Sequence, residues 1–362
     1  MSIVCMLHNI NNMGVILLNN MNIQLNSAGI DFNEFQSVLG QSIGGSLSLK
    51  LKNVLSGKKI VFSCYERNHV PLGGWDVRSN PGCEKTIKSI RSVNEAMLVA
   101  AVDSSSIRIA ETEDGSIYAI KCGIAFALNG HAIMHFKIGP ILFYLSNETI
   151  KTSELDHRLA RLVLLDVESA KRLIRVRVER AIQMKLSNHF VNAIIVVDGA
   201  LKSSPYEKNN QNITRIAENC SIRKNVLLGI SKSTSFKLLD KVSAPLTKIK
   251  EAAYMNIDVI IQSLSKSAIG NNLLVKLGKN NSPILRADIV CPNGDTGNSI
   301  GKLLANDSMA GGYPETLRLA HHVSAFSNTE ISCLRGHLLS NYDLTELQSE
   351  DIRKTLLGSI PA

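Results

Sequence analysis

Two runs of apolar residues, far apart in the sequence, each end directly at an aspartate. Residues 96–102 read AMLVAAV and precede Asp103, and residues 193–197 read AIIVV and precede Asp198. Runs that are apolar at every position, rather than at alternate positions, predict strands buried on both faces of a sheet. A chain with such strands has to cover both faces of the sheet, and we therefore expect helices on each side.

The segment between the two runs predicts further strands and a long helix. A Glu-Asp-Gly turn at 113–115 separates two segments of alternating apolar residues, which is typical of a β-hairpin. Residues 131–145 predict another strand, and residues 153–189 predict a helix with Ser153 as its N-cap. Because strand–helix–strand connections join parallel strands, we expect the sheet to be partly parallel.

The pattern of apolar strands and helices continues beyond Asp198. The predicted elements are a strand at 225–230, helical pieces within 239–265, strands at 273–278 and 284–290, and a final helix from Tyr313 to about Ser327. The predicted fold class is therefore α/β, with a mixed sheet core flanked by helices and preceded by an N-terminal extension.

Composition and turn residues indicate how the chain is divided and what it binds. The segment 70–83 is dense in Gly and Pro and marks a boundary. We divide the chain into an N-terminal region (1–90), a main α/β domain (91–330) and a C-terminal helical tail (331–362). The 40 Lys and Arg residues exceed the 31 Asp and Glu residues, which favours a polyanionic partner. Scattered cysteines without a CxxC pair, and no membrane-length apolar stretch, predict a cytoplasmic protein without a membrane partner.

A third carboxylate accompanies the two aspartates. Glu179 is the one acidic residue in the basic helical segment 171–185, and it flanks the apolar stripe of that segment. Asp103 and Asp198 are expected at the carboxyl ends of their strands, where parallel sheets bind ligands, and their carboxylates face each other if the two strands are neighbours. An Asp on a first strand, a Glu on the helix after the third strand and an Asp ending the fourth form a ribonuclease-H-like acidic arrangement. A salt bridge from Glu179 to a helix arginine is the structural alternative.

The three carboxylates predict a site for divalent metal ions. Hard cations such as Mg²⁺ and Mn²⁺ prefer carboxylate oxygen and water as ligands. Two such ions, about 4 Å apart, activate a water molecule and stabilise the leaving oxygen of a phosphodiester. Clustered carboxylates without a metal repel one another, and a metal-binding role is therefore favoured over a purely structural one.

Five motifs in this order resemble the NurA nucleases of DNA end processing. They are VAAVDSSSIRI (99–109), the helix with Glu179, IIVVDGALKSSP (195–205), LLGISKSTS (227–235) and GGYPETLRLAHHVSAF (311–326). Where the first family motif normally has Asp-Gly-Ser, this chain has Asp103-Ser104-Ser105. The change removes a glycine but keeps the aspartate.

The resemblance implies a function and a set of site residues. It implies a Mn²⁺-dependent DNA nuclease with 5′–3′ exonuclease and single-strand endonuclease activity, Mg²⁺ being the weaker cofactor. It also implies a homodimer that works with a HerA-like hexameric translocase in DNA end resection and repair. The expected metal ligands are Asp103, Glu179, Asp198 and His321, with Tyr313 positioning the substrate from the start of the final helix.

Basic residues near these motifs predict contacts with DNA. Lys232 follows an apolar strand among hydroxyl side chains, which suits a phosphate, although a solvated loop lysine has the same pattern. Arg286 is a candidate for a phosphate contact, whereas structural pairing is favoured for the neighbouring Asp288. Arg175 belongs to the basic helix, whose face either binds DNA or is simply solvated.

Two other functional classes fit parts of the pattern. An actin-like nucleotide phosphatase would use Ser104–Ser106 and Asp198-Gly199 as phosphate loops. A catalytically dead DNA-binding scaffold would explain the missing glycine after Asp103. Hydrolysis of labelled DNA with Mn²⁺ and without a nucleotide distinguishes a nuclease from both alternatives.

Overall fold

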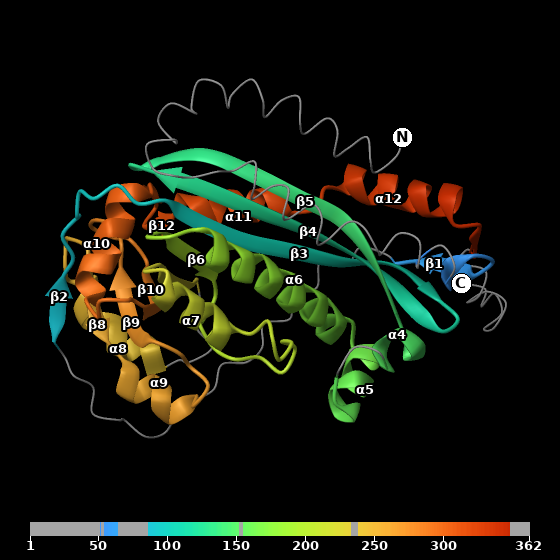
Figure 1. The fold of residues 1–362 in the computed structure, drawn as a ribbon, viewed down its shortest axis with the longest axis horizontal. Helices are drawn as coiled ribbons and strands as arrows, with labels where there is room; N and C mark the ends of the chain where they lie inside the picture. Colours follow the sequence, from blue (N-terminus) through green and yellow to red (C-terminus); the bar gives the residue numbers. More distant parts are fainter. Residues whose placement is uncertain (1–50, 52–53, 64–85, 152–154, 233–237, 348–362) are drawn as a thin grey trace, which may run out of the picture. The chain divides into compact units, whose positions relative to one another are not determined.

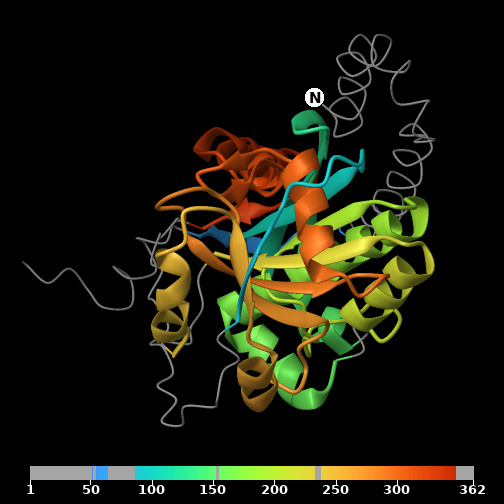
Figure 2. The same ribbon diagram turned by 90° about the vertical axis from the view of Figure 1, so that its left-hand side faces the viewer.

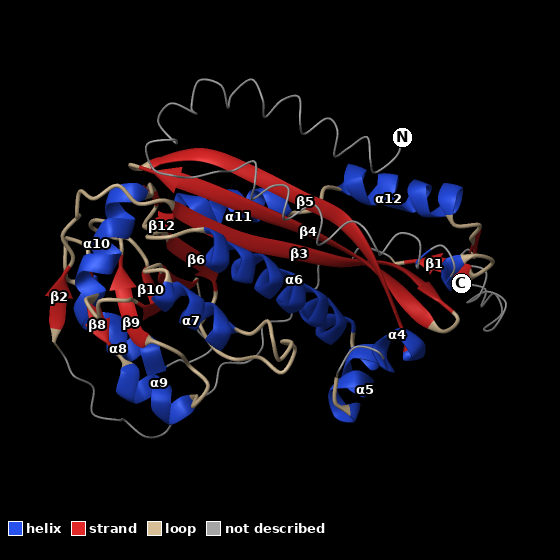
Figure 3. Ribbon diagram, viewed as in Figure 1, coloured by secondary structure: helices blue, strands red, loops and turns tan. Residues whose placement is uncertain are grey.

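The computed structural model describes Leu51 and residues 54–63, 86–151, 155–232 and 238–347. The N-cap predicted at Ser153 lies outside these residues, as does most of the N-terminal region. The described chain forms one large mixed sheet with helices packed against it (Figure 1; Figure 3, where strands are red). This arrangement confirms the α/β class predicted from the sequence. No helix in these segments has the length and apolar character needed to cross a membrane.

The first part of the sheet contains the strands predicted around the two aspartates. β3 (Val99–Thr112), β4 (Gly115–Leu128) and β5 (His131–Ser146) form an antiparallel meander, which confirms the hairpin. β6 (Ile194–Asp198) and β7 (Val226–Ser231) follow on the other side of β3 and run parallel to it. An Asp on the first of these five strands and an Asp ending the fourth are therefore placed as expected.

The sheet continues past β7 with antiparallel strands. These are β10 (Ile284–Val290), β9 (Asn271–Lys276), β8 (Ala253–Asn256) and β2 (Ile87–Ser89), in this spatial order. The helical interpretation of 239–265 is only partly right, because α8 (Leu238–Thr247) and α9 (Asp258–Leu264) enclose β8. β8 pairs with both β9 and β2, and this long-range pairing overrides the local helical pattern.

A strand from the N-terminal part of the chain joins the far end of the same sheet. β1 (Lys59–Phe62) pairs antiparallel with the last residues of β3, and β13 (Thr345–Glu346) pairs parallel with β1. The division of the chain near residues 90 and 330 stays a prediction. β1, which precedes residue 90, and β13, which follows residue 330, both belong to the same sheet as β3.

The predicted helix over 153–189 is interrupted. After α4 (Asn147–Lys151), α5 (His157–Leu165) and α6 (Val167–His189) are separate helices that meet at Asp166. Asp166 has an extended backbone, and its side chain accepts hydrogen bonds from the N–H groups of Glu168 and Ser169. An aspartate in this conformation satisfies the first donors of a helix, and it therefore ends α5 and starts α6.

Besides the short α4, the described residues include two longer helices that were not predicted from the sequence. α7 (Ile213–Ile222) and α10 (Thr296–Asn306) each begin after a capping side chain, Asn212 and Asp295 respectively. α12 (Asn328–Asn341) begins with a capping box formed by Ser327 and Glu330. It supplies the helix expected in the C-terminal tail, beginning slightly earlier than residue 331.

The last predicted helix begins later than expected. Tyr313 and Pro314 form the short strand β12, which pairs with β11 (Met309–Ala310), and α11 runs from Glu315 to Ser324. The connecting Gly311 and Gly312 both have positive φ, the conformation that two-residue hairpin turns favour. The prediction that Tyr313 and His321 lie on one continuous helix is therefore wrong.

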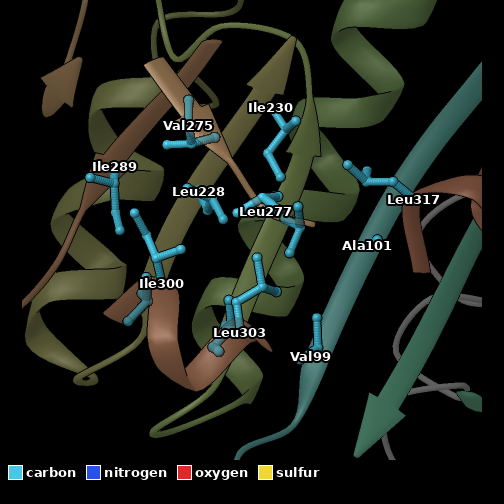
Figure 4. Close-up of a cluster of buried hydrophobic side chains, with 14 of the residues drawn as sticks. Val99, Ala101, Leu228, Ile230, Val275, Leu277, Ile289, Ile300, Leu303 and Leu317 are labelled. Carbon is cyan, nitrogen blue, oxygen red and sulfur yellow. The ribbon is translucent and has the colours of Figure 1, made fainter. Parts of the chain in front are cut away.

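The largest hydrophobic core fills the face of the sheet that α10 and α11 cover. Figure 4 shows side chains from β3, β7, β9 and β10 pointing toward those of the two helices, among them Val99, Leu228, Ile300 and Leu317. Complete burial of one such aliphatic side chain contributes about 1.5–3 kcal/mol to folding. The view in Figure 2 shows these elements stacked at one end of the sheet.

Candidate active site

Asp103 and Asp198 lie on neighbouring parallel strands. Val102 of β3 is in register with Val197 of β6, and the two aspartates follow these residues directly. Since side chains alternate between faces, both aspartates are on the side of Ala101 and Val196, which belong to the core under α11. The structure therefore confirms that the two carboxyl-bearing positions are adjacent.

The sequence suggested that Asp103 lies at the end of its strand, and this prediction is wrong. β3 continues to Thr112, whereas β6 ends at Asp198. β4 pairs along nearly the whole of one edge of β3, and the other edge pairs first with β6 and then, from Ala110, with β1. Between these two partners, no described strand pairs with this edge of β3. Asp103 and Asp198 stand where this open edge begins.

His321 reaches Asp103 from α11. Its Nδ1 atom lies 2.7 Å from Oδ2 of Asp103, whose other oxygen accepts a hydrogen bond from the backbone N–H of Ser104. The Asp103 side chain is 4% exposed and the His321 side chain is 57% exposed. The pair therefore connects a buried carboxylate to the surface. The predicted association of His321 with the acidic site is supported by this contact.

Asp198 has two partners of its own. Its Oδ2 atom lies 3.0 Å from the ammonium of Lys232, and its Oδ1 atom accepts a 3.4 Å hydrogen bond from the Tyr313 hydroxyl. The Lys232 ammonium also lies 5.2 Å from the centre of the Tyr313 ring. Burial raises the pKa of Tyr313, and the charges of Asp198 and Asp103 raise it further. The phenol therefore stays protonated and acts as a donor.

Glu179 approaches from the opposite side of the sheet. It lies on α6, accepts a hydrogen bond from the hydroxyl of Ser104, and has Arg175 as an ion-pair partner at 3.7 Å. Ser104 neighbours Asp103 on β3, and so its side chain points to the other face. Burial raises the pKa of Glu179, the charge of Asp103 raises it further, and Arg175 opposes both effects.

The four predicted ligands do not form one compact cluster, because Asp103 pairs with His321 whereas Asp198 and Glu179 have other partners. In the part of the chain that the structure describes, no three His, Cys, Asp or Glu side chains lie close enough together to hold a metal ion as they stand. The donor set nevertheless fits a hard divalent cation, because two carboxylates on adjacent strands offer oxygen ligands and repel one another without a cation. Glu179 and His321 stand beside them on either face.

The structure contradicts the predicted DNA contact of Arg286. Both Arg286 and Asp288 are buried in β10, where two nitrogen atoms of the guanidinium donate 2.9 Å hydrogen bonds to the two oxygens of the carboxylate. A third hydrogen bond runs from Arg286 to Asn272. The residues share one face of the strand, as their alternation predicts, and face each other rather than solvent. The structural pairing favoured for Asp288 is confirmed.

Most of the basic helix face is also engaged within the protein. Arg172 lies over the Tyr206 ring, Arg177 donates to the Tyr206 carbonyl, and Arg180 forms an ion pair with Glu207. These contacts hold the segment between β6 and α7 against α6. Arg175 differs, because half of its side chain is exposed. It is the member of this face that stays a candidate for DNA.

Two residues near the site were missed as participants by the sequence analysis. Ser104 was considered as the replacement of a glycine and as part of a phosphate loop, but not as a partner of Glu179, to which its hydroxyl donates a hydrogen bond. Lys121 of β4 is buried on the same face as Asp103, and its ammonium binds Glu330 at the start of α12. A lysine inside the apolar run IYAIKCGIAFA was a signal for such a buried partner.

Comparison with solved structures finds nucleases among the similar chains. No family model and no curated protein sequence matches the chain. The NurA nuclease from Sulfolobus solfataricus is similar with a TM-score of 0.41 and 14% identity, over 69% of this chain and 86% of that chain. A NurA structure bound to dAMP and manganese gives a TM-score of 0.45 and 12% identity, over 70% and 90% of the two chains. The catalytic domain of human endonuclease V gives 0.34 and 12% identity, over 75% and 92%. The family that the sequence motifs resemble is thus present among the similar structures.

Proposed function

We propose that the chain is a metal-dependent nuclease that hydrolyses phosphodiester bonds of DNA. The observation that carries this proposal is the placement of Asp103 and Asp198 side by side at the end of β6, on one face of the sheet. His321 lies beside the Asp103 carboxylate, and Lys232 lies beside the Asp198 carboxylate. Glu179 is linked to β3 through its hydrogen bond with Ser104. An acidic centre with cationic neighbours suits a metal ion that binds a phosphate.

The residues divide into ligands and groups that handle the substrate. Asp103, Asp198, Glu179 and His321 are the groups that would hold Mn²⁺, with Mg²⁺ as the weaker alternative. The ion supplies activation of water and stabilisation of charge on the leaving oxygen. His321 orients the carboxylate of Asp103 through Nδ1, and Tyr313 does the same for Asp198 through its hydroxyl. Lys232 and Arg175 are exposed cations that bind backbone phosphates.

The finer assignments are supported by the motif resemblance. We propose 5′–3′ exonuclease and single-strand endonuclease activity, a mechanism of the two-metal type, and a role in DNA end resection and repair. The same resemblance supports a homodimer with a HerA-like translocase as its partner. A cytoplasmic location also stays a prediction.

Cleavage of labelled DNA by the purified chain tests the proposed function. The wild type should cut DNA with Mn²⁺, cut it more slowly with Mg²⁺, and stop when the metal is chelated. Asp103→Ala, Glu179→Ala and Asp198→Ala should each abolish cleavage, because each removes a ligand of the proposed metal ion. Glu218→Gln, at an exposed carboxylate on α7, is the matched control and should cut normally.

The outcomes separate the proposal from its alternatives. Normal turnover by Asp198→Ala would exclude the metal-site assignment. Release of phosphate from a nucleotide, without DNA cleavage, would support the actin-like phosphatase. Binding of DNA or of the translocase without any cleavage would support the inactive scaffold.

A further inference from the structure

The chain bends directly after Asp198, and several backbone groups of this turn are hydrogen-bonded. The N–H of Gly199 donates to the carbonyl of Ile230, and the carbonyl of Leu201 accepts from the N–H of Ile269, with donor–acceptor distances of 2.8 Å. Gly199 has a φ of +108°, a conformation that glycine adopts without strain. Leu201 is completely buried. The position of Asp198 therefore depends on how this turn is held.

One hydrogen bond of the turn ends on a side chain rather than on the backbone. The N–H of Leu201 donates a 2.9 Å hydrogen bond to Oδ2 of Asp288. The same oxygen and its partner Oδ1 accept the two hydrogen bonds of Arg286, and Asn272 accepts a third from the guanidinium. Asp288 is completely buried, and Arg286 is nearly so. This carboxylate is thus the acceptor that fixes a buried N–H three residues beyond Asp198.

A buried ion pair of this kind is poorly explained by stability alone. The cost of removing two charges from water offsets most of their attraction, and apolar side chains of similar volume often serve the fold equally well. The backbone contact is different, because a buried N–H without an acceptor is unfavourable and no apolar side chain can provide one. The pair supplies an acceptor whose position is fixed by the bidentate geometry of the arginine.

We propose that Arg286 and Asp288 are positioning residues, which hold the turn at Leu201 and thereby place the carboxylate of Asp198 for its metal ion. Neither residue touches the substrate in this assignment, and Asp288 acts through the backbone. The consequence for catalysis rests on the proposed nuclease function, whereas the effects on the turn and on metal affinity do not require cleavage.

Two double variants test the inference. Arg286→Met with Asp288→Leu replaces the pair by apolar side chains and leaves Leu201 without an acceptor. Arg286→Met with Asp288→Asn removes both charges but keeps a side-chain oxygen for the Leu201 N–H. Asn272, the cross-strand neighbour of position 288, can accept from the introduced amide. The two variants therefore differ in whether the side chain at position 288 offers an acceptor to the Leu201 N–H, which is the feature that the inference requires.

Three measurements on the full chain compare these variants with the wild type. They are thermal unfolding, hydrogen–deuterium exchange of the peptide that contains Leu201, and the Kd of Mn²⁺ by calorimetry. The leucine variant should fold but exchange faster in this peptide, and it should bind Mn²⁺ about 10–100-fold more weakly, as outer-shell changes at metal sites typically do. The Kd of the asparagine variant for Mn²⁺ should remain within about threefold of the wild-type value, which is the rescue that a positioning role predicts.

Several results would overturn the inference. A leucine variant with wild-type exchange and wild-type Mn²⁺ affinity would show that the contact at Leu201 does not place Asp198. Equal weakening in both variants would show that the charges, and not the acceptor, matter. If the leucine variant does not fold, the asparagine variant still decides, since impaired Mn²⁺ binding in it contradicts the inference and retained binding supports it. Absence of DNA cleavage by a wild type that binds Mn²⁺ would refute the nuclease proposal alone.

Discussion

A methyl group added at Gly123 should separate α11 from the sheet and disturb the active site. Gly123 of β4 is the cross-strand partner of Asp103. A Cβ atom there would overlap the carbonyl oxygen of Ala320 and lie 3.0 Å from Cβ of Val323, both on α11. Since the overlap is with the backbone, a rotamer change cannot relieve it. The helix has to move away by about 1 Å to restore ordinary van der Waals contact.

The structure gives the size of the effect on stability and on the site. Overpacking of a core position costs about 1–3 kcal/mol, and each kcal/mol lowers the Tm by roughly 1–2 °C in a chain of 362 residues. His321 follows Ala320 directly, and its 2.7 Å contact with Asp103 would lengthen beyond hydrogen-bonding range. Misplacement of a site by about 1 Å costs on the order of 100-fold in rate.

Thermal unfolding and DNA cleavage, measured on Gly123→Ala, test this reasoning. Cleavage is measured well below the Tm of the variant, so that loss of rate is not loss of folded protein. Gly336→Ala is the control, because Gly336 lies on α12 with nothing within 4 Å of an added Cβ. The control should gain up to about 1 kcal/mol from helix propensity. An unchanged Tm and rate in Gly123→Ala would refute the close seating of α11 on β4.

Three further predictions follow from the charges around the site. Burial raises the pKa of Asp307 to about 6, above its ordinary value of 3.8. Protonation of Asp307 therefore stabilises the fold fully below about pH 4, and this contribution of at most about 3 kcal/mol is lost as the pH rises through 6. When the free energy of unfolding is measured in urea between pH 4 and 7, Asp307→Asn should remove this decrease in stability with rising pH. A variant whose stability falls with pH as in the wild type would contradict the assignment to Asp307. Lys232→Met should raise the KM for DNA and reduce the salt slope of binding by about one, whereas an unaltered slope would exclude a phosphate contact. His321→Ala should lower the rate and narrow the preference for Mn²⁺ over Mg²⁺, because imidazole suits transition metals. His322→Ala, at the exposed neighbouring residue, is the control. An equal ratio of the Mn²⁺ rate to the Mg²⁺ rate in the two variants would contradict the role of His321.

Local sequence patterns predicted the central strands because burial leaves a direct trace in composition. The runs before Asp103 and Asp198 are apolar at every position, and the structure buries both faces of β3 and β6 there. The hairpin was equally accessible, since its turn chemistry lies within a few residues. The common edge of the two aspartates followed from a general rule for parallel strands, whereas the pairing of β3 with β6 was established by the structure.

Properties set by distant partners were not accessible from the sequence. The apolar run before Asp103 and the first arm of the hairpin form one continuous strand, β3, whose last residues pair with β1, and this pairing with β1 has no local signal. Tyr313 leaves the predicted helix because it pairs with Ala310 across a glycine turn. Arg286 was assigned to DNA because an arginine in a strand looks the same whether it faces a phosphate or a buried carboxylate. Its partner, Asp288, stands two residues away and was already recognised as structural.

The open edge of β3 would let residues from both faces of one sheet serve the proposed metal site. Asp103 and Ser104 are consecutive and therefore point to opposite faces, the first toward His321 on α11 and the second toward Glu179 on α6. Inside a sheet, the neighbouring strand would keep these groups apart. Here β6 ends at Asp198, and groups from either face can reach around the uncovered edge. The end of β6 and the continuation of β3 thus matter as much for the site as the carboxylates themselves.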